Sequence, residues 1–467
     1  MAELISSTEK KLRFLGMLWL FSLGFFLWGV ATVELKIFPY QVIKSTYKEI
    51  EAFVKGDPAD NRPIWKRYWT QVTVYPFAFD ITPKPFPVEI NLSPVDTTAY
   101  EGPEIKYLDK NQYYSDSNLN GYFLIYGSFA FENSNWGAIL ISTGGQVLRG
   151  WPIKPDNFDY KLAHIGMAVS ENGNIATNTN GVLSSYSWCG NKDWEAEWKK
   201  QPERYSHDHV KGYDYHHDIS FYDGKFYTFR GPVILSIDET TGKVVDRIHV
   251  LDMIRWAREQ DLAIFDARFT RYYKANELDL NKFAEIAVSD PFHFNKVDVL
   301  SRELAPSFDG FEEGDMLVSM RELNLVFVMR PKESKILWYR YGLTSRQHDA
   351  TFQRGYIAVF DNNPFSNSGR SPRIMRLEIN DHSRSVLFDL RKWGAKNMQV
   401  KGNFELDDDT HILMFSDDDN GRAVIGDLSG RPMFVFENSV DQKKNLELRN
   451  ITYITPEKFE KWSSHCK

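Results

Sequence analysis

Four histidines in this chain stand at the same place in a repeated local pattern. His164, His217 and His348 each lead a short strand-like run that is followed by a glycine turn and a second run, and His293 leads a similar run. Histidine changes charge near neutral pH and serves as a metal ligand, a proton carrier or a nucleophile. Four histidines in register therefore suggest a functional site. The simplest structural alternative is a ring of polar side chains that fills a channel.

The residues around the histidines favour group transfer over metal binding. Asp218 and Asp349 directly follow a histidine, so on a strand they should point to the opposite face, which weakens a metal site. Arg321 ends the strand that follows His293, where its planar guanidinium could bind an oxyanion. Such a set suits transfer of a tetrahedral anionic group, sulfuryl or phosphoryl. One neutral imidazole would attack and another would protonate the leaving oxygen, so we expect no metal and no cofactor.

Short strands broken by Gly, Asn and Asp turns dominate the sequence from Asn120 onward, and the one substantial helical pattern is Val250–Gln260. Each histidine-led hairpin is followed by a second hairpin, such as PVILSIDETTGKVVDRI, and a weaker copy has Gly402 in the histidine's place. A four-stranded unit that recurs at roughly 50 to 75 residues is typical of a propeller blade. We therefore expect an all-β fold, a six-bladed β-propeller preceded by a transmembrane helix. A solenoid and a set of unrelated hairpins are the alternatives.

A propeller would bring the distant histidines together. Equivalent positions in successive blades point at one central axis, and the residue that opens the innermost strand lies at one mouth of the channel. His164, His217, His293 and His348 should therefore converge. Any two of the last three should lie within about four strand spacings of ~4.8 Å each.

The motifs HHDISF, FHFNKVD and RQHDATF, with the blade-closing hairpins, resemble the bacterial PAPS-independent arylsulfotransferases over roughly residues 120–440. Enzymes of that family are exported six-bladed propellers. They move a sulfuryl group from a phenolic sulfate ester to another phenol through a sulfohistidine intermediate. The resemblance implies that His348 becomes sulfated and that His217 and His293 are its partners. It also implies that Asn295, in the FHxN motif, and the following Arg321 bind the sulfate group.

Two further residues complete the expected site. We assign His164, the first of the aligned histidines, and Arg346, two residues before His348, to substrate binding. One departure from the family is an acidic stretch, SRELAPSFDGFEEGD, between His293 and Arg321.

The N-terminal region carries a transmembrane signal. Phe14–Val33 is a run of 20 residues without a charge, long enough to cross a bilayer as a helix. Lys10, Lys11 and Arg13 precede it, so the positive-inside rule places the N-terminus in the cytoplasm and the large domain outside. We expect an uncleaved single-pass anchor, with a cleaved signal peptide as the alternative.

These patterns divide the chain into four segments. We expect a cytoplasmic tail at 1–13, a transmembrane anchor at 14–33, a linker helix with irregular and edge-strand structure at 34–118, and a propeller domain at 119–467.

Composition limits the partners. The net charge of −7 gives no reason to expect nucleic acid, and an aromatic content of 15% suits packed β-sheets. Cys189 and Cys466 are the two cysteines, and we expect them to be unpaired, although a disulfide between them is an alternative.

Two classes of function fit these observations. The first is a membrane-anchored sulfotransferase that takes an aryl sulfate donor and a phenolic acceptor. The second is a non-catalytic propeller that binds or assembles other molecules. A hydrolase of sulfate or phosphate esters, with water as acceptor, is a weaker third option. Each of these three functions is compatible with a homodimer.

Overall fold

The computed structural model describes residues 86–116, 118–132, 134–153, 166–179, 182–196, 215–265, 273–274, 277–278, 292–363, 371–395, 398, 402–407, 411–418, 420–441 and 444–466. Contacts within the chain separate two units, Met1–Val74 and Tyr75–Lys467, and every described residue belongs to the second. The expected anchor Phe14–Val33 and His164 lie outside the described residues. In the described part of the chain, no helix combines the length and the apolar character that a membrane span requires.

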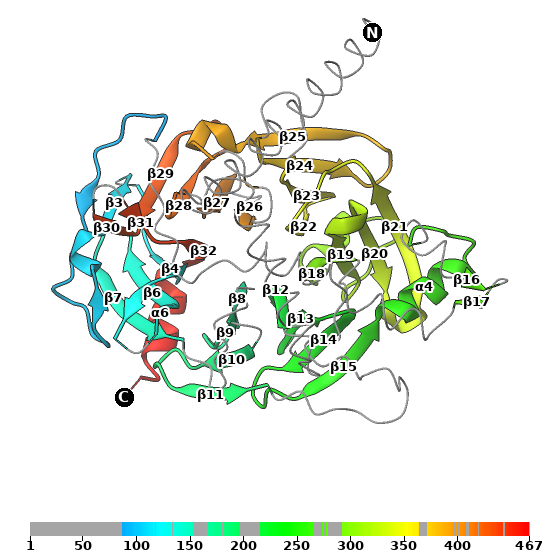
Figure 1. Cartoon of the computed structure of the whole chain (residues 1–467), viewed down its shortest axis with the longest axis horizontal. Coiled ribbons are helices and arrows are strands. Elements are labelled where there is room, and N and C mark those ends of the chain that lie inside the picture. The colour runs from blue at the N-terminus through cyan, green and yellow to red at the C-terminus, as the bar shows by residue number, and fades with distance from the viewer. Residues whose placement is uncertain are drawn as a thin grey trace, which may run out of the picture. The chain divides into compact units, whose positions relative to one another are not determined.

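The second unit is a six-bladed β-propeller, as the repeats predict. Six antiparallel sheets follow one another around a ring, with the first strand of each nearest the centre and the last toward the outside (Figure 1). Blade 1 contains β32 (Leu448–Ile454), β4 (Tyr122–Gly127), β6 (Gly137–Ser142) and β7 (Val147–Pro152). Blade 2 contains β8 (Gly166–Val169), β9 (Ile175–Thr179), β10 (Val182–Tyr186) and β11 (Lys192–Glu195). Blade 3 contains β12 (Tyr215–Tyr222), β13 (Lys225–Arg230), β14 (Val233–Asp238) and β15 (Val244–His249).

The other three blades repeat this order. Blade 4 contains β18 (Phe294–Val299), β19 (Met316–Met320), β20 (Leu325–Arg330) and β21 (Lys335–Tyr341). Blade 5 contains β22 (Ala350–Gln353), β23 (Tyr356–Asp361), β24 (Arg373–Glu378) and β25 (Arg384–Asp389). Blade 6 contains β26 (Phe404–Asp407), β27 (Ile412–Asp417), β28 (Arg422–Asp427) and β29 (Pro432–Glu437), and β3 (Gln112–Ser115) and β1 (Ser93–Pro94) extend its outer edge.

Smaller elements connect the blades. Three two-stranded sheets pair β2 (Ile105–Lys106) with β5 (Ala130–Phe131), β16 (Tyr273–Lys274) with β17 (Glu277–Leu278), and β30 (Ser439–Asp441) with β31 (Lys444–Asn445). The α-helices within the described ranges are α4 (Val250–Glu259), which matches the helical pattern of the sequence, and α6 (Pro456–Ser463). Short 3-10 turns are η1 (Leu108–Lys110), η4 (Ala305–Ser307), η5 (Arg321–Leu323), η6 (Pro331–Glu333) and η7 (Leu390–Trp393).

The core consists of apolar layers between neighbouring blades. Side chains alternate across a strand, so in β20 Leu325 and Phe327 pack toward blade 3, whereas Val326 and Val328 pack toward blade 5. The middle strands of each sheet are therefore buried on both faces, which explains why a strand such as β20 (LVFVMR) is apolar at nearly every position. Six such clusters occupy the six boundaries between blades. This packing fixes the height of each innermost strand and hence the positions of the residues that open it.

The ring is closed by the two ends of the propeller sequence. The innermost strand of blade 1, β32, is contributed by the C-terminal part of the chain and pairs with β4. Helix α6 follows, and Cys466 beyond it forms a disulfide with Cys189 of blade 2, across a sequence separation of 277 residues. Our expectation of unpaired cysteines was wrong. The spacing of the two cysteines in the sequence does not predict this disulfide, because only closure of the ring brings the C-terminal segment next to blade 2.

Candidate active site

Three of the aligned histidines open the innermost strands of three consecutive blades. His217 lies in β12, His293 directly precedes β18, and His348 lies two residues before β22. The fourth, His164, is outside the described residues. The ring therefore places three histidines that are far apart in sequence at one end of the channel.

The three imidazoles are in close proximity. The Nε2 atoms of His217 and His293 are 2.5 Å apart, and the centroids of these two rings are 4.5 Å apart. The ring of His348 lies 5.6 Å from that of His217. A hydrogen bond between two imidazole nitrogens requires one ring to donate and the other to accept, so the His217–His293 pair holds a proton between its rings.

Unusual backbone geometry presents these side chains. His217, His293 and Arg346 have φ values of 56°, 50° and 52°, in the left-handed region that non-glycine residues rarely occupy. The pairing of β12 with β13 is interrupted between His216 and Ser220, and that of β18 with β19 is interrupted at Asn295. Bulges of this kind re-aim side chains, and strained backbone clusters at functional sites.

His348 is held in a form that can act as a nucleophile. It is 4% exposed, and its Nδ1 lies 2.6 Å from Asn362 Oδ1 and 3.1 Å from the Arg346 carbonyl oxygen. Asn362 donates from its own Nδ2 to the Met398 carbonyl at 2.7 Å, which fixes the amide so that its oxygen faces His348. Both neighbours of Nδ1 are acceptors, so Nδ1 carries the proton. Nε2 then bears the lone pair, and it is buried with no hydrogen-bond partner among the described residues.

The surroundings keep His348 neutral. Burial lowers its pKa to about 3, and the positive charges of Arg321 and Arg346 act in the same direction. The hydrogen bonds that His348 Nδ1 donates to Asn362 Oδ1 and to the Arg346 carbonyl oppose this shift. A neutral imidazole with a free lone pair beside guanidinium groups is what attack on an anionic ester requires.

This shift predicts a pH dependence of folding. The pKa of His348 lies below the value of about 6.5 for an unperturbed histidine, so the folded state disfavours protonation. The resulting stabilisation is fully present above pH 6.5 and is lost as the pH falls toward 3. The free energy of unfolding should fall by up to about 1.4 kcal/mol per pH unit more in the native protein than in a His348→Gln variant.

Urea denaturation at several pH values between 7 and 4 measures this difference. His382→Gln, at an exposed histidine between β24 and β25, is the matched control. Parallel pH dependence in the native protein and His348→Gln would mean that His348 is not held neutral by the fold.

Arg321 lies where the sequence places it, beside the histidines. It follows β19 and opens η5, and its backbone N–H donates to the His293 carbonyl at 3.0 Å. Its guanidinium donates to Glu322 Oε1 from Nε at 3.0 Å and from Nη2 at 2.8 Å. Arg346 Nη2 is 3.6 Å from the same carboxylate oxygen. The Glu322 carboxylate is thus the anionic partner of both guanidinium groups. An oxyanion of a substrate would take the place of that carboxylate.

Asn295 is the remaining predicted residue that the structure describes at the site. It occupies the bulge between His293 and Lys296 and is 2% exposed. Neither its Nδ2 nor its Oδ1 has a hydrogen-bond partner among the described residues. A buried amide without partners costs stability, so this side chain fits a role in binding a polar ligand.

Two residues that contact the candidate site were not found in the sequence analysis, Asn362 and Glu322. Asn362 directly follows β23, the second strand of blade 5, just as Arg321 follows the second strand of blade 4. Aligning the second strands as well as the first would have found it. Glu322 adjoins Arg321 in sequence, but its link to Arg346 depends on the packing of blade 4 against blade 5.

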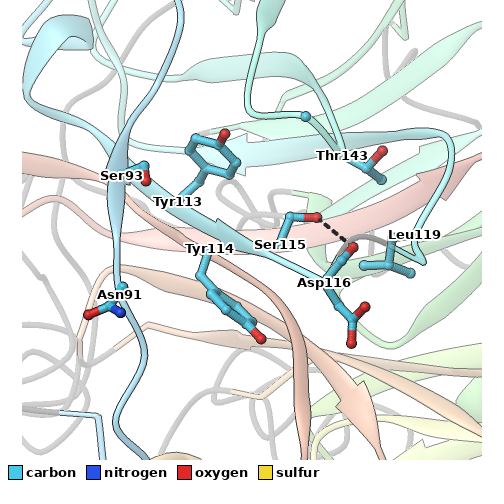
Figure 2. Close-up of a pocket in the computed structure, with 9 residues that line it drawn as sticks. Asn91, Ser93, Tyr113, Tyr114, Ser115, Asp116, Leu119 and Thr143 are labelled. Carbon is cyan, nitrogen blue, oxygen red and sulfur yellow. Dashed lines mark hydrogen bonds between the residues drawn. The ribbon is translucent and has the colours of Figure 1, made fainter.

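Two further features of the described residues bear on the chemistry of this site: the groups that could bind a metal, and a cavity. In the described ranges no group of three or more His, Cys, Asp or Glu side chains is arranged to hold a metal ion. A cavity of about 450 Å³ lies away from the histidines, on the outer strand β3 and the turn between β6 and β7 (Figure 2). It is lined by Asn91, Ser93, Tyr113, Tyr114, Ser115, Asp116, Leu119, Thr143 and Gly144. It contains no histidine or arginine, so it is not the site of the chemistry described above.

The fold and the site are those of a β-propeller in which histidines and arginines from consecutive blades come together. A model of the arylsulfotransferase (ASST) family matches residues 166–439, more than half of the chain. The chain belongs to the arylsulfotransferase family. A search of curated proteins found none that matches this sequence.

Solved structures are similar only at a distance. A protein of unknown function from Bacteroides caccae has 12% identity and a TM-score of 0.42, over 72% of this chain and 99% of that chain. Virginiamycin B lyase from Staphylococcus aureus has 10% identity and a TM-score of 0.37, over 71% of this chain and 88% of that chain. At these TM-scores the similarities carry no functional information.

Proposed function

We propose that this protein transfers a sulfuryl group from an aryl sulfate ester to a phenolic acceptor, without PAPS, through a sulfohistidine at His348. Membership of the arylsulfotransferase family supports the class of reaction. The observation that carries the proposal is the buried Nε2 of His348, which has a free lone pair, beside the charge of Arg321.

The site supplies each step of such a transfer. The His348 Nε2 lone pair attacks sulfur, an S–N bond forms, and the bond between sulfur and the aryl oxygen breaks. The His217–His293 pair enters this step with one imidazolium, and the leaving phenolate takes a proton from it, which leaves both rings neutral. The acceptor phenol then returns a proton to that pair as its oxygen attacks sulfur and the S–N bond breaks. Sulfur keeps its oxidation state, so the sequence of steps needs no redox partner.

The charges of the site match those that develop on the sulfuryl group. Its equatorial oxygens carry negative charge throughout, and Arg321 and Arg346 present guanidinium groups held by a shared carboxylate. Donors that are fixed in advance stabilise a transition state without the cost of reorganisation. Asn295, two residues after His293, offers an amide donor and acceptor that have no hydrogen-bond partner among the described residues.

Incubation of the protein with a chromogenic aryl sulfate, with and without a phenol, tests the proposed function. We expect chromophore release that depends on the phenol, together with formation of the new aryl sulfate. Release without phenol would instead indicate a hydrolase. No release with a range of aryl sulfates would favour a non-catalytic propeller.

We further propose that the propeller lies on the extracytoplasmic side of a membrane, attached by Phe14–Val33. The disulfide between Cys189 and Cys466 supports this, because such bonds persist mainly in oxidising compartments. In spheroplasts of a bacterial host that expresses the full chain, added protease should digest the large domain. Complete protection of that domain, with a periplasmic marker digested in the same sample, would contradict this topology.

A further inference from the structure

A buried ionic cluster lies among the residues that follow the three histidines. Lys296 Nζ forms an ion pair with Asp218 Oδ2 and lies 3.6 Å from Asp349 Oδ1. The side chains of Lys296, Asp218 and Asp349 are 11%, 13% and 2% exposed. The two acids come from blades 3 and 5, and they meet a lysine from the blade between them.

The cluster is connected to the site through the backbone. Asp218 directly follows His217, Asp349 directly follows His348, and Lys296 is three residues after His293. The ion pair that holds each aspartate in place therefore also holds the backbone of the histidine that precedes it. One ammonium group joins the histidine-bearing segments of blades 3, 4 and 5.

Further contacts make this junction rigid. Asp298 Oδ2 accepts a hydrogen bond from the Phe352 backbone N–H at 2.8 Å, which ties β18 to β22. Ser220 Oγ donates to the Val297 carbonyl at 2.6 Å, which ties β12 to β18. Asp349 Oδ2 accepts from the Phe404 backbone N–H at 3.3 Å, which extends the connection to blade 6.

Stability alone does not account for this arrangement. Burial opposes the charge of Lys296, but Asp218, Asp349 and Asp298 together raise its pKa above the ordinary value for lysine. Burial raises the pKa of Asp349 above its ordinary range, although Lys296 opposes that shift. A buried group of one cation and three carboxylates costs desolvation that apolar residues of the same volume would avoid. Such a cluster is more easily explained by the geometry that it imposes.

We propose that Lys296 is a positioning residue, whose ammonium group sets the spacing of His217, His293 and His348 by holding Asp218 and Asp349. This role rests on the proposed sulfuryl transfer, and it makes a separate structural prediction about the histidine pair. Lys296 touches no reacting atom, so its removal should act on the rate of the chemical step more than on substrate binding.

The test compares Lys296→Met with a Lys296→Met/Asp218→Asn double variant. The single variant leaves Asp218 buried without its cation, which can prevent folding. The double variant removes both charges of the ion pair. Asp349, whose pKa burial already raises, can take up a proton when Lys296 is lost, so this variant is expected to fold. Lys335→Met, at an exposed lysine of β21 in the same blade, is the matched control.

Two measurements are made on each folded variant. In the double variant, kcat with an aryl sulfate and a phenol should fall about 10²-fold with little change in KM, because a displacement of about 1 Å can have that effect. The far-downfield proton resonance of the short His217–His293 hydrogen bond should be lost or moved upfield. Lys335→Met should change neither quantity.

The outcomes separate the two proposals. If the double variant folds and keeps both the native kcat and the native histidine resonance, Lys296 does not position the site. If the native protein transfers no sulfuryl group, the proposed function fails. The histidine resonance then still decides whether Lys296 sets the spacing.

Discussion

Replacing His348 with alanine should abolish sulfuryl transfer and formation of any covalent intermediate. The structure leaves Nε2 of this residue buried, neutral and without a hydrogen-bond partner among the described residues, and no other described imidazole at the site has its Nδ1 held by Asn362. Loss of a nucleophile costs on the order of 10⁶-fold in kcat in a well-studied protease. Steady-state rates with a chromogenic aryl sulfate and a phenol measure this loss.

Two substitutions serve as controls for His348→Ala. His382→Ala removes an exposed histidine of the same blade and should leave kcat unchanged. His164→Ala should have a smaller effect than His348→Ala, because the motifs shared with the family do not include His164. A His348→Ala variant that folds and retains more than a few per cent of native turnover would mean that another group attacks sulfur.

Replacing Arg321 with alanine should leave the fold intact and reduce kcat by about 10²- to 10³-fold, the usual cost of losing one fixed donor to a developing oxyanion. The side chain is 11% exposed, and its guanidinium donates two hydrogen bonds to Glu322. Its loss therefore removes charge and hydrogen bonds from the site without opening an apolar layer. Thermal unfolding and steady-state kinetics, measured on the same preparation, separate these two effects.

Arg321→Lys tests whether the planar fork matters. Lysine keeps the charge but cannot donate two parallel hydrogen bonds, so it should recover only part of the lost rate. Arg302→Ala, at an exposed arginine paired with Glu313, is the matched control and should leave kcat unchanged. Full activity in folded Arg321→Ala would exclude this arginine from sulfuryl binding.

The blades could be predicted from the sequence because local physics determines them. Turn glycines, apolar strands such as Leu325–Arg330 and a repeat spacing are all visible within one blade. Alignment of the repeats also correctly predicts that His217, His293 and His348 come together. It also predicts the position of Arg321 next to His293, despite the acidic stretch that separates them in the sequence.

Prediction from the sequence failed where the structure depends on contacts between blades. The contact of Glu322 with Arg346 depends on the packing of blade 4 against blade 5, and the role of Lys296 requires acids from the blades on either side. The disulfide between Cys189 and Cys466 depends on ring closure in the same way. Pairings of this kind have no period and no fixed spacing, so a single sequence does not reveal them.

Intact-mass analysis after mixing the protein with an aryl sulfate and no acceptor tests the central claim most directly. We expect an adduct of the mass of one sulfuryl group, which peptide mapping assigns to His348 and which disappears when a phenol is added. The adduct should be absent from His348→Ala. An adduct that persists in His348→Ala, or donor cleavage by the native protein with no adduct at any time, would contradict a sulfohistidine at His348.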